Sequence, residues 1–194
     1  MWMPQHGNPP QLDITDDKSI ELCYKTIEQI FGRLDVLINN AGTSGTELKQ
    51  DGAEPTSREL WTHVLNINTI STGVFTEAML PLLENSKDPR IVFISSLLGS
   101  TGTMVKNGKC FAPGLPFYSA SKSAINHYAA QLALTHPNIK VNACCPGLRG
   151  TKLTNLAPEG DRDPALGAVN AVRLATDTTG ITGTYSNTEG PIPW

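Results

Sequence analysis

A short apolar segment, followed by a segment that carries a tyrosine and a lysine, constrains the fold of this chain most. Residues Ile91 to Ile94 are all apolar and mostly β-branched, which favours a strand buried on both faces. A glycine-containing loop follows. After it, apolar residues recur at helical spacing from Tyr118 to Leu134. A buried strand that leads into a helix predicts an α/β fold built on a parallel sheet.

The same two segments place three chemically useful side chains in one region. Tyr118 and Lys122 are four residues apart, so they share one face of the predicted helix. An ammonium group near a phenol stabilises the phenolate, and we therefore expect the pKa of Tyr118 to fall below its reference value of about 10. Ser96 follows the strand and is expected to hold the reacting oxygen. The pattern predicts a site that transfers a proton at a carbonyl or an alcohol.

Ser96, Tyr118 and Lys122 at this spacing resemble the short-chain dehydrogenase/reductase family. Further segments resemble the family's motifs in the same order along the chain. They are the turn Asn39-Asn40-Ala41-Gly42, the helical Asn68, the PGxxxT loop from Pro146 to Thr151, and a tail, Thr182 to Trp194, like that of carbonyl-reductase-like members. The resemblance runs from about Leu12 to Trp194.

The resemblance implies a role for each residue of the catalytic set. Tyr118 is the acid and base, and Lys122 lowers its pKa and binds ribose. Ser96 positions the substrate oxygen. Asn68 binds a backbone carbonyl and a water that relays protons to the lysine, although a mid-helix asparagine taken alone would more often face solvent.

The resemblance also implies a cofactor site, with NADP favoured and NAD not excluded. Asp13 would contact adenine, although the residues alone equally allow it merely to start a helix. The PGxxxT loop would hold the nicotinamide amide and the phosphates, with Arg149 standing where the family usually has an apolar residue. The residues expected at the cofactor are Asp13, Asn40, Ala41, Gly42, Tyr118, Lys122, Pro146, Gly147, Arg149 and Thr151.

The family's TGxxxGxG turn, which cradles the pyrophosphate, has no counterpart in the sequence. We therefore expect an N-terminally truncated Rossmann-type fold: a doubly wound parallel sheet flanked by helices, without its first two strand–helix units. Leu12 to Thr15 would end a strand, and the strand at Val36 would become an edge. Four outcomes stay open: the Leu12 segment pairs with that edge, another chain covers it, the product folds poorly, or the sequence is a fragment or begins at a mis-predicted start.

Composition and length limit the classes of partner. A chain of 194 residues with 39% apolar residues predicts one domain, 12–194, after a loose leader, 1–11. A net charge of −3 gives no reason to expect nucleic acid or membrane as a partner. The start lacks a signal-peptide core, so we expect a cytoplasmic protein. The four cysteines show no metal-ligand spacing, so no metal is expected.

The remaining segments give a coarse map of the chain. Hydrophobic periodicity predicts one long helix from Ser57 to Leu83, and glycine and proline predict an irregular loop from Thr101 to Pro116. Two histidines, His63 and His127, show no partner pattern and are expected at the surface or satisfied in the core. Further elements are expected as a helix that Thr15 or Asp16 caps and that Gly32 ends, a strand at 138–145, a surface helix at 163–175 and a last strand at 183–185.

Three functions are consistent with this reading. The first is reversible hydride transfer between NADP(H) and a small-molecule carbonyl or alcohol, with secondary metabolism as one setting. The second is a cofactor-independent isomerase, dehydratase or cyclase that uses the same tyrosine and lysine. The third is a non-catalytic remnant of the family. Self-association through the exposed sheet edge is expected with any of them.

Overall fold

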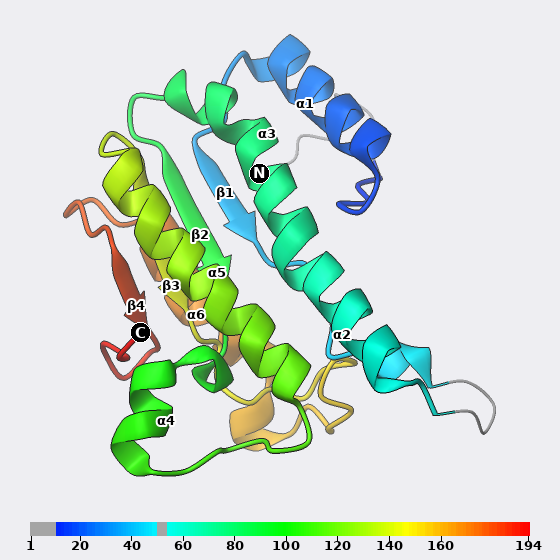
Figure 1. The fold of residues 1–194 in the computed structure, drawn as a ribbon. Helices are drawn as coiled ribbons and strands as arrows, with labels where there is room; N and C mark the ends of the chain where they lie inside the picture. Colours follow the sequence, from blue (N-terminus) through cyan, green and yellow to red (C-terminus); the bar gives the residue numbers. More distant parts are fainter. Residues whose placement is uncertain (1–10, 50–53) are drawn as a thin grey trace.

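A computed structural model describes residues 11–49 and 54–194 of the chain. Its centre is a four-stranded, all-parallel sheet with the strand order β1-β2-β3-β4 (Figure 1). The strands are β1 (Val36–Asn39), β2 (Arg90–Ile94), β3 (Lys140–Cys144) and β4 (Thr184–Ser186). The helices are α1 (Asp17–Phe31), α2 (Ser57–Leu65), α3 (Thr72–Glu84), α4 (Thr101–Asn107), α5 (Pro116–Thr135) and α6 (Pro164–Ala175). The predicted α/β class with a parallel sheet is confirmed.

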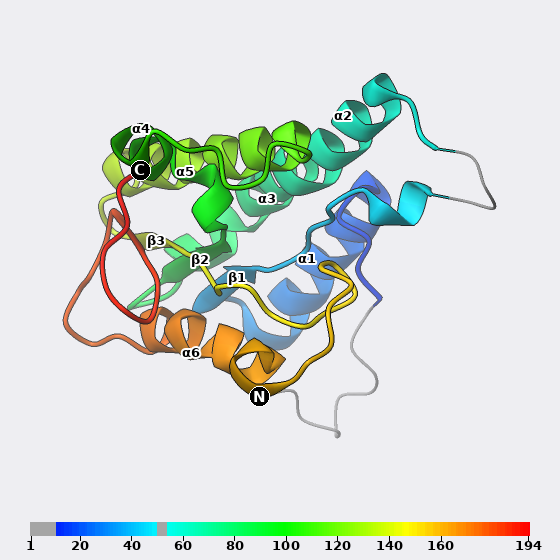
Figure 2. The same cartoon turned by 90° about the horizontal axis from the view of Figure 1, so that it is seen from below.

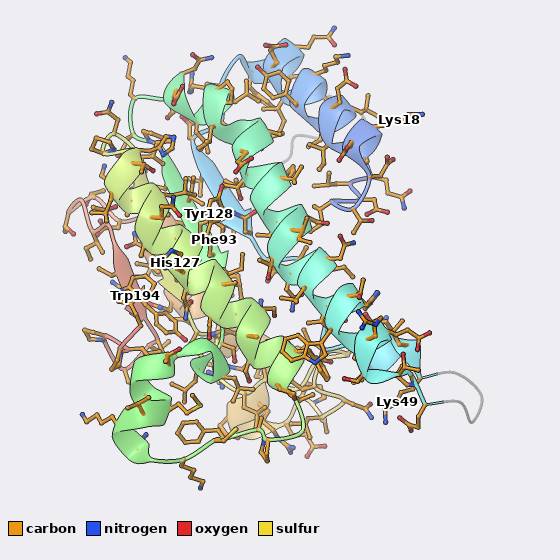
Figure 3. The ribbon with its side chains drawn as sticks, in the orientation of Figure 1. Lys18, Lys49, Phe93, His127, Tyr128 and Trp194 are labelled. Carbon is orange, nitrogen blue, oxygen red and sulfur yellow. The ribbon has the colours of Figure 1, made fainter. Side chains whose placement is uncertain are left out.

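Helices cover the two faces of the sheet unequally. Figure 2 shows α3 and α5 on one face and α6 on the other. The larger core lies under α3 and α5, where Phe93 of β2 meets Tyr128 of α5 edge-on, with 5.7 Å between the ring centroids (Figure 3). The smaller core joins Val92 and Cys144 to α6. Both faces of β2 and β3 are therefore buried, as their near-continuous apolar sequences predicted.

The strand β1 forms an edge of the sheet, as expected. Among the described residues it pairs only with β2, and Ile38 remains 42% exposed. The prediction that Leu12 to Thr15 ends a strand is wrong, because this segment is a turn held by hydrogen bonds from the Thr15 amide and hydroxyl to the Asp13 carboxylate. Of the predicted leader, only Gln11 lies within the described residues.

The helix α1 begins and ends as its sequence predicted. The Asp16 side chain accepts a hydrogen bond from the Lys18 amide at the start of α1. Gly32 ends the helix in the left-handed conformation, with a φ of 67°, and its amide donates to the Glu28 carbonyl. Ile20 and Cys23 face the core, where they pack near α3.

The long helix expected from Ser57 to Leu83 is continuous but not uniform. Six residues, Asn66–Ser71, form a π-helical turn between α2 and α3. Such turns insert an extra residue into the helical ladder and often lie at functional sites. Asn68 and Ser71 are buried in this turn, at the point where the sequence showed polar residues interrupting the apolar stripe.

The loop expected at Thr101 to Pro116 contains a helix, α4, which is a correction to the prediction. Ser100 caps this helix through the Thr103 amide, and Gly108 ends it with a φ of 57°. The C-terminal tail holds it in place, because the Gly102 amide donates to the Trp194 carbonyl at 2.6 Å. This partner is more than ninety residues away, so the local pattern of glycine and proline could not reveal it.

The helix expected at 163–175 is α6, which packs one side on the sheet and leaves apolar residues of the other side exposed to solvent. Val169 and Val172 are each 53% exposed, whereas Ala171 and Leu174 pack on the sheet. Across residues 11–49 and 54–194, no helix is long and apolar enough to cross a bilayer. In the same residues, no group of three or more histidine, cysteine or acidic side chains could hold a metal ion.

Candidate active site

The carboxyl ends of the four parallel strands lie at one edge of the sheet. The register places Asn39 of β1 opposite Phe93 of β2, and Ile94 of β2 opposite Cys144 of β3. The segments that leave this edge carry predicted site residues, among them Asn40 after β1, Ser96 after β2 and Pro146 after β3. Open α/β sheets bind their ligands outside this edge.

Lys122 lies inside the molecule beneath this edge. Its side chain is buried, and its ammonium donates a hydrogen bond of 2.8 Å to the Ile94 carbonyl at the end of β2. The Nζ atom lies 5.7 Å from the centroid of the Tyr118 ring, one helical turn away on α5. Burial lowers the pKa of Lys122 to about 8, because removal from water penalises the charged form.

Tyr118 is also buried, and its ionisation is shifted in a direction opposite to our expectation. Burial raises the pKa of the Tyr118 phenol, and a hydrogen bond with Ser96 opposes the shift only in part. The predicted lowering by Lys122 is therefore wrong for this state of the chain. The ammonium is bonded to the Ile94 carbonyl, so desolvation of the phenol dominates.

Ser96 is held at the end of β2 by backbone contacts on both sides. The Tyr185 hydroxyl donates to the Ser96 carbonyl at 2.6 Å, and the Cys145 sulfur accepts from the Leu97 amide at 3.1 Å. Tyr185 is itself buried and stacks on Trp194, with 5.6 Å between the ring centroids. Tyr185 was missed as a site residue, because nothing in its local sequence indicates a partner 89 residues away.

Gly99 allows the serine segment and the tyrosine helix to approach each other closely. A Cβ atom on Gly99 would lie 2.7 Å from the carbonyl carbon and the Cβ of Lys122. The Gly99 carbonyl accepts hydrogen bonds from the side chains of Ser123 and Asn126 of α5, each at 3.0 Å. Ser96, Tyr118 and Lys122 are thus brought together by a contact that only glycine permits.

Asn68 joins the π-helical turn to the segment that follows β1. Its amide oxygen accepts from the Thr43 amide at 2.8 Å, and its amide nitrogen donates to the Thr43 carbonyl at 2.9 Å. The same nitrogen lies 3.0 Å from the Ser121 hydroxyl of α5. Asn68 is 1% exposed, so the solvent-facing alternative for this residue is wrong.

Gly42 links this asparagine to the buried lysine. A Cβ atom on Gly42 would lie 3.2 Å from the Asn68 amide oxygen and 3.5 Å from the Lys122 ammonium. The predicted catalytic residues therefore surround one small region at the carboxyl edge: Asn68 and Lys122 meet at Gly42, Lys122 lies over the Tyr118 ring, and Ser96 is near enough to Tyr118 to lower the pKa of its phenol.

Comparison with known proteins agrees with this geometry. A family model described as short chain dehydrogenase matches residues 6–161. The chain belongs to the short-chain dehydrogenase family. The short-chain dehydrogenase/reductase eupG of a Phoma species is 36% identical over 183 residues, which cover 85% of this chain and 65% of that relative. This chain therefore spans just under two thirds of the relative's length.

Solved structures share the fold. Salutaridine reductase from Papaver somniferum superposes with a TM-score of 0.72 at 27% identity, over 92% of this chain and 81% of that one. The NADPH-bound carbonyl reductase from chicken fatty liver gives a TM-score of 0.75 at 23% identity, over 95% of this chain and 76% of that one. The second likeness shows the arrangement of helices and strands.

In this short-chain dehydrogenase the segment after β1 presents an uncovered backbone. Asn40, Ala41 and Gly42 are all exposed at the carboxyl edge. The neighbouring loop after β3 is tied to the same region, because the Ser44 hydroxyl donates to the Leu153 carbonyl at 2.9 Å. The structure thus brings the two predicted cofactor-binding segments to one side of Lys122.

The loop after β3 begins next to the serine segment. Pro146 is half-buried, and the Gly147 amide lies 3.4 Å from the Cys145 sulfur that also receives the Leu97 amide. Gly147 has a φ of 75°, a conformation that favours glycine. Thr151 is exposed, and its amide donates to the Thr154 hydroxyl at 3.1 Å. Its own hydroxyl has no hydrogen-bond partner among the described residues.

Two other predicted cofactor residues are engaged within the chain. The Asp13 carboxylate accepts from the Thr15 hydroxyl at 2.7 Å, and this bond lowers the pKa of Asp13. The Arg149 guanidinium donates to the Asp161 carbonyl and packs against Gly167 of α6. Arg149 therefore braces the loop after β3 against the start of α6, a role that its sequence position did not predict.

Proposed function

We propose that this chain catalyses the reversible, NADP(H)-dependent reduction of a carbonyl group on a small molecule in the cytoplasm. The observation that carries the proposal is the meeting of Ser96, Tyr118, Lys122 and Asn68 at the carboxyl edge of the sheet. Membership of the short-chain dehydrogenase family supports the reaction class. An NADPH-bound carbonyl reductase among the structural relatives supports the cofactor class.

The protonation states of the site suit the reductive direction. The raised pKa keeps the Tyr118 phenol protonated near neutral pH, so it can donate a proton to a developing alkoxide. Ser96, which lies near that phenol, would donate a second hydrogen bond to the same oxygen. Lys122 with a pKa of about 8 carries a charge below that pH and stabilises the phenolate that remains.

The residues around Lys122 fit the nicotinamide and ribose end of such a cofactor. The buried ammonium has one described acceptor, the Ile94 carbonyl, and retains further hydrogens for ribose hydroxyls. Asn40, Ala41 and Gly42 offer an exposed backbone beside it. When bound, the nicotinamide would supply or accept the hydride. The sequence has no TGxxxGxG turn for the pyrophosphate, so we assign the phosphate end no ligand beyond Thr151.

A titration with NADPH tests the cofactor assignment. The intrinsic fluorescence of the purified chain should be quenched as NADPH binds, and oxidation of NADPH should follow when aldehydes, ketones or quinones are added. Tyr118→Phe should abolish turnover while leaving binding intact. Tyr24→Phe is the matched control, because Tyr24 lies on α1 and bonds only to the surface residue Glu28.

A second function is consistent with the same site geometry. The same phenol and ammonium can move protons without a hydride carrier, as in an isomerase, dehydratase or cyclase. No binding of NADPH at millimolar concentration would remove the reductase proposal and favour this alternative. Loss of activity in Tyr118→Phe would support both enzymatic functions, the reductase and the cofactor-independent enzyme. A non-catalytic remnant would show no activity even in the unmodified chain.

We further propose that a second copy of this chain pairs with the outer edge of β1. One side of β1 has no strand partner among the described residues, and Ile38 of this strand remains 42% exposed. A short apolar edge with free amide and carbonyl groups can accept another strand. Sedimentation at increasing protein concentration should then show association.

A further inference from the structure

His63 and Glu47 form a pair that the sequence did not indicate. His63 lies on α2 and Glu47 lies on a short 3-10 helix, η2 (Thr46–Leu48), sixteen residues earlier. The His63 Nε2 atom donates to the Glu47 Oε1 atom at 2.7 Å. The His63 side chain is 30% exposed and that of Glu47 is 49% exposed, so the pair is partly shielded from water.

The pair is continuous with the segment that follows β1. The same Glu47 oxygen accepts a short hydrogen bond from the Thr43 hydroxyl. That hydroxyl also accepts from the Gly45 amide at 2.8 Å. Burial alone would raise the pKa of Glu47, but the bonds from Thr43 and His63 more than offset it and lower the pKa. Glu47 is therefore an anion bound by two donors near neutral pH.

Thr43 connects this pair to Asn68. Thr43 is buried, and both its backbone amide and its backbone carbonyl bond to the Asn68 side chain, at 2.8 and 2.9 Å. The two bonds fix the plane of the asparagine amide. A displacement of Thr43 would break at least one of them and would move Asn68 relative to Gly42 and Lys122.

Neither His63 nor Glu47 reaches the buried lysine or the phenol. His63 faces an open groove of about 670 Å³, whose charged lining residues are Glu54, Arg58 and Glu59. The pair therefore acts through Thr43 and not on reacting atoms. We propose that His63 and Glu47 are positioning residues that hold Thr43 and thereby orient Asn68; the catalytic part of this inference rests on the proposed reductase function.

Hydrogen exchange and steady-state kinetics on the full chain test this proposal together. Glu47→Ala and His63→Ala should each accelerate amide exchange at Thr43, which is protected by the Asn68 oxygen. Each should lower kcat by about tenfold, because small misplacements of catalytic groups are costly, with a smaller change in KM. The double variant should lose no more than either single variant, since both changes break one connected unit.

A conservative variant separates positioning from a general effect on folding. His63→Gln keeps an N–H donor near the position of Nε2 and should restore protection at Thr43 and most of kcat. His127→Ala is the matched control, because His127 is exposed on α5 and lies outside this chain of contacts (Figure 3). The control should behave as the unmodified chain in both measurements.

Two results would overturn the proposal. Unchanged exchange at Thr43 in both alanine variants would show that the pair does not hold the segment. Accelerated exchange with kcat within twofold of the unmodified chain would show that the segment does not orient Asn68 for catalysis. If the unmodified chain turns over no carbonyl substrate, the reductase function fails. Amide exchange at Thr43 then still decides whether His63 and Glu47 hold Thr43 in place.

Discussion

Replacement of Gly99 by alanine should disrupt the site although it replaces none of the proposed catalytic residues. The new Cβ atom would lie 2.7 Å from two Lys122 atoms and 2.9 Å from the Ser123 amide nitrogen, whereas ordinary contacts begin at 3.4 Å. The closest atoms must therefore separate by about 0.7 Å. They belong mainly to the backbone of α5 and cannot swing aside.

Two effects follow from that separation. Overpacking of this kind costs about 1–3 kcal/mol of unfolding free energy. Movement of Lys122 relative to Ser96 should reduce turnover by up to about 10²-fold, because displacements near 1 Å can have that effect. Urea denaturation followed by circular dichroism measures the first effect, and oxidation of NADPH with a carbonyl substrate measures the second.

Gly73→Ala is the matched control for this substitution. Gly73 lies inside α3, and a Cβ atom there meets no atom within 4 Å. Alanine should therefore stabilise the helix by about 0.5–1 kcal/mol. A Gly99→Ala variant that unfolds at the same urea concentration as the unmodified chain, with turnover within twofold, would refute the close-packing argument.

Four further outcomes are expected. Tyr118→Phe should lower turnover by about 10²- to 10⁴-fold with little change in the urea midpoint, and activity equal to that of Tyr24→Phe would contradict the role of the phenol. Reductive turnover should fall as pH rises through about 8, where Lys122 loses its charge; a flat profile there would exclude that role. In the folded chain the pKa of Lys122 is about 8, which is lower than its ordinary value of 10.5. This group should therefore make the unfolding free energy rise with pH between those two values, as urea titrations at several pH values would show. Ile38→Lys should reduce concentration-dependent association in sedimentation experiments, since charge on an edge strand opposes pairing, and unchanged association would place the contact elsewhere.

Much of the fold was predictable because its signals are local. The apolar strands β2 and β3, the helix stop at Gly32 and the long helix interrupted at Asn68 all follow from periodicity and residue type. Two elements were mis-assigned where distant contacts decide the conformation. The helix α4 depends on the tail at Trp194, and the segment from Leu12 to Thr15 has no strand partner and forms a turn instead.

The proposed catalytic set was predicted from motifs, but the electrostatics around it could not be. Spacing along one helix placed Tyr118 and Lys122 together, and the structure confirms that they lie on adjacent turns. Whether the pKa of the Tyr118 phenol is raised or lowered depends on the burial of the phenol and on which group the Lys122 ammonium contacts. The burial of the phenol and the bond of the Lys122 ammonium depend on β2 and on the segment at Gly99. The spacing of residues along α5 gives no information about either.

The sequence by itself determined which residues line the carboxyl edge of the sheet, because strand ends and helix faces follow from local periodicity. Only the tertiary structure decided how those residues are held. The bond from Tyr185 to Ser96 and the path from His63 through Glu47 and Thr43 to Asn68 join different elements of the fold. Hydrogen bonds and burial of this kind arise when distant segments pack, so no local pattern specifies them.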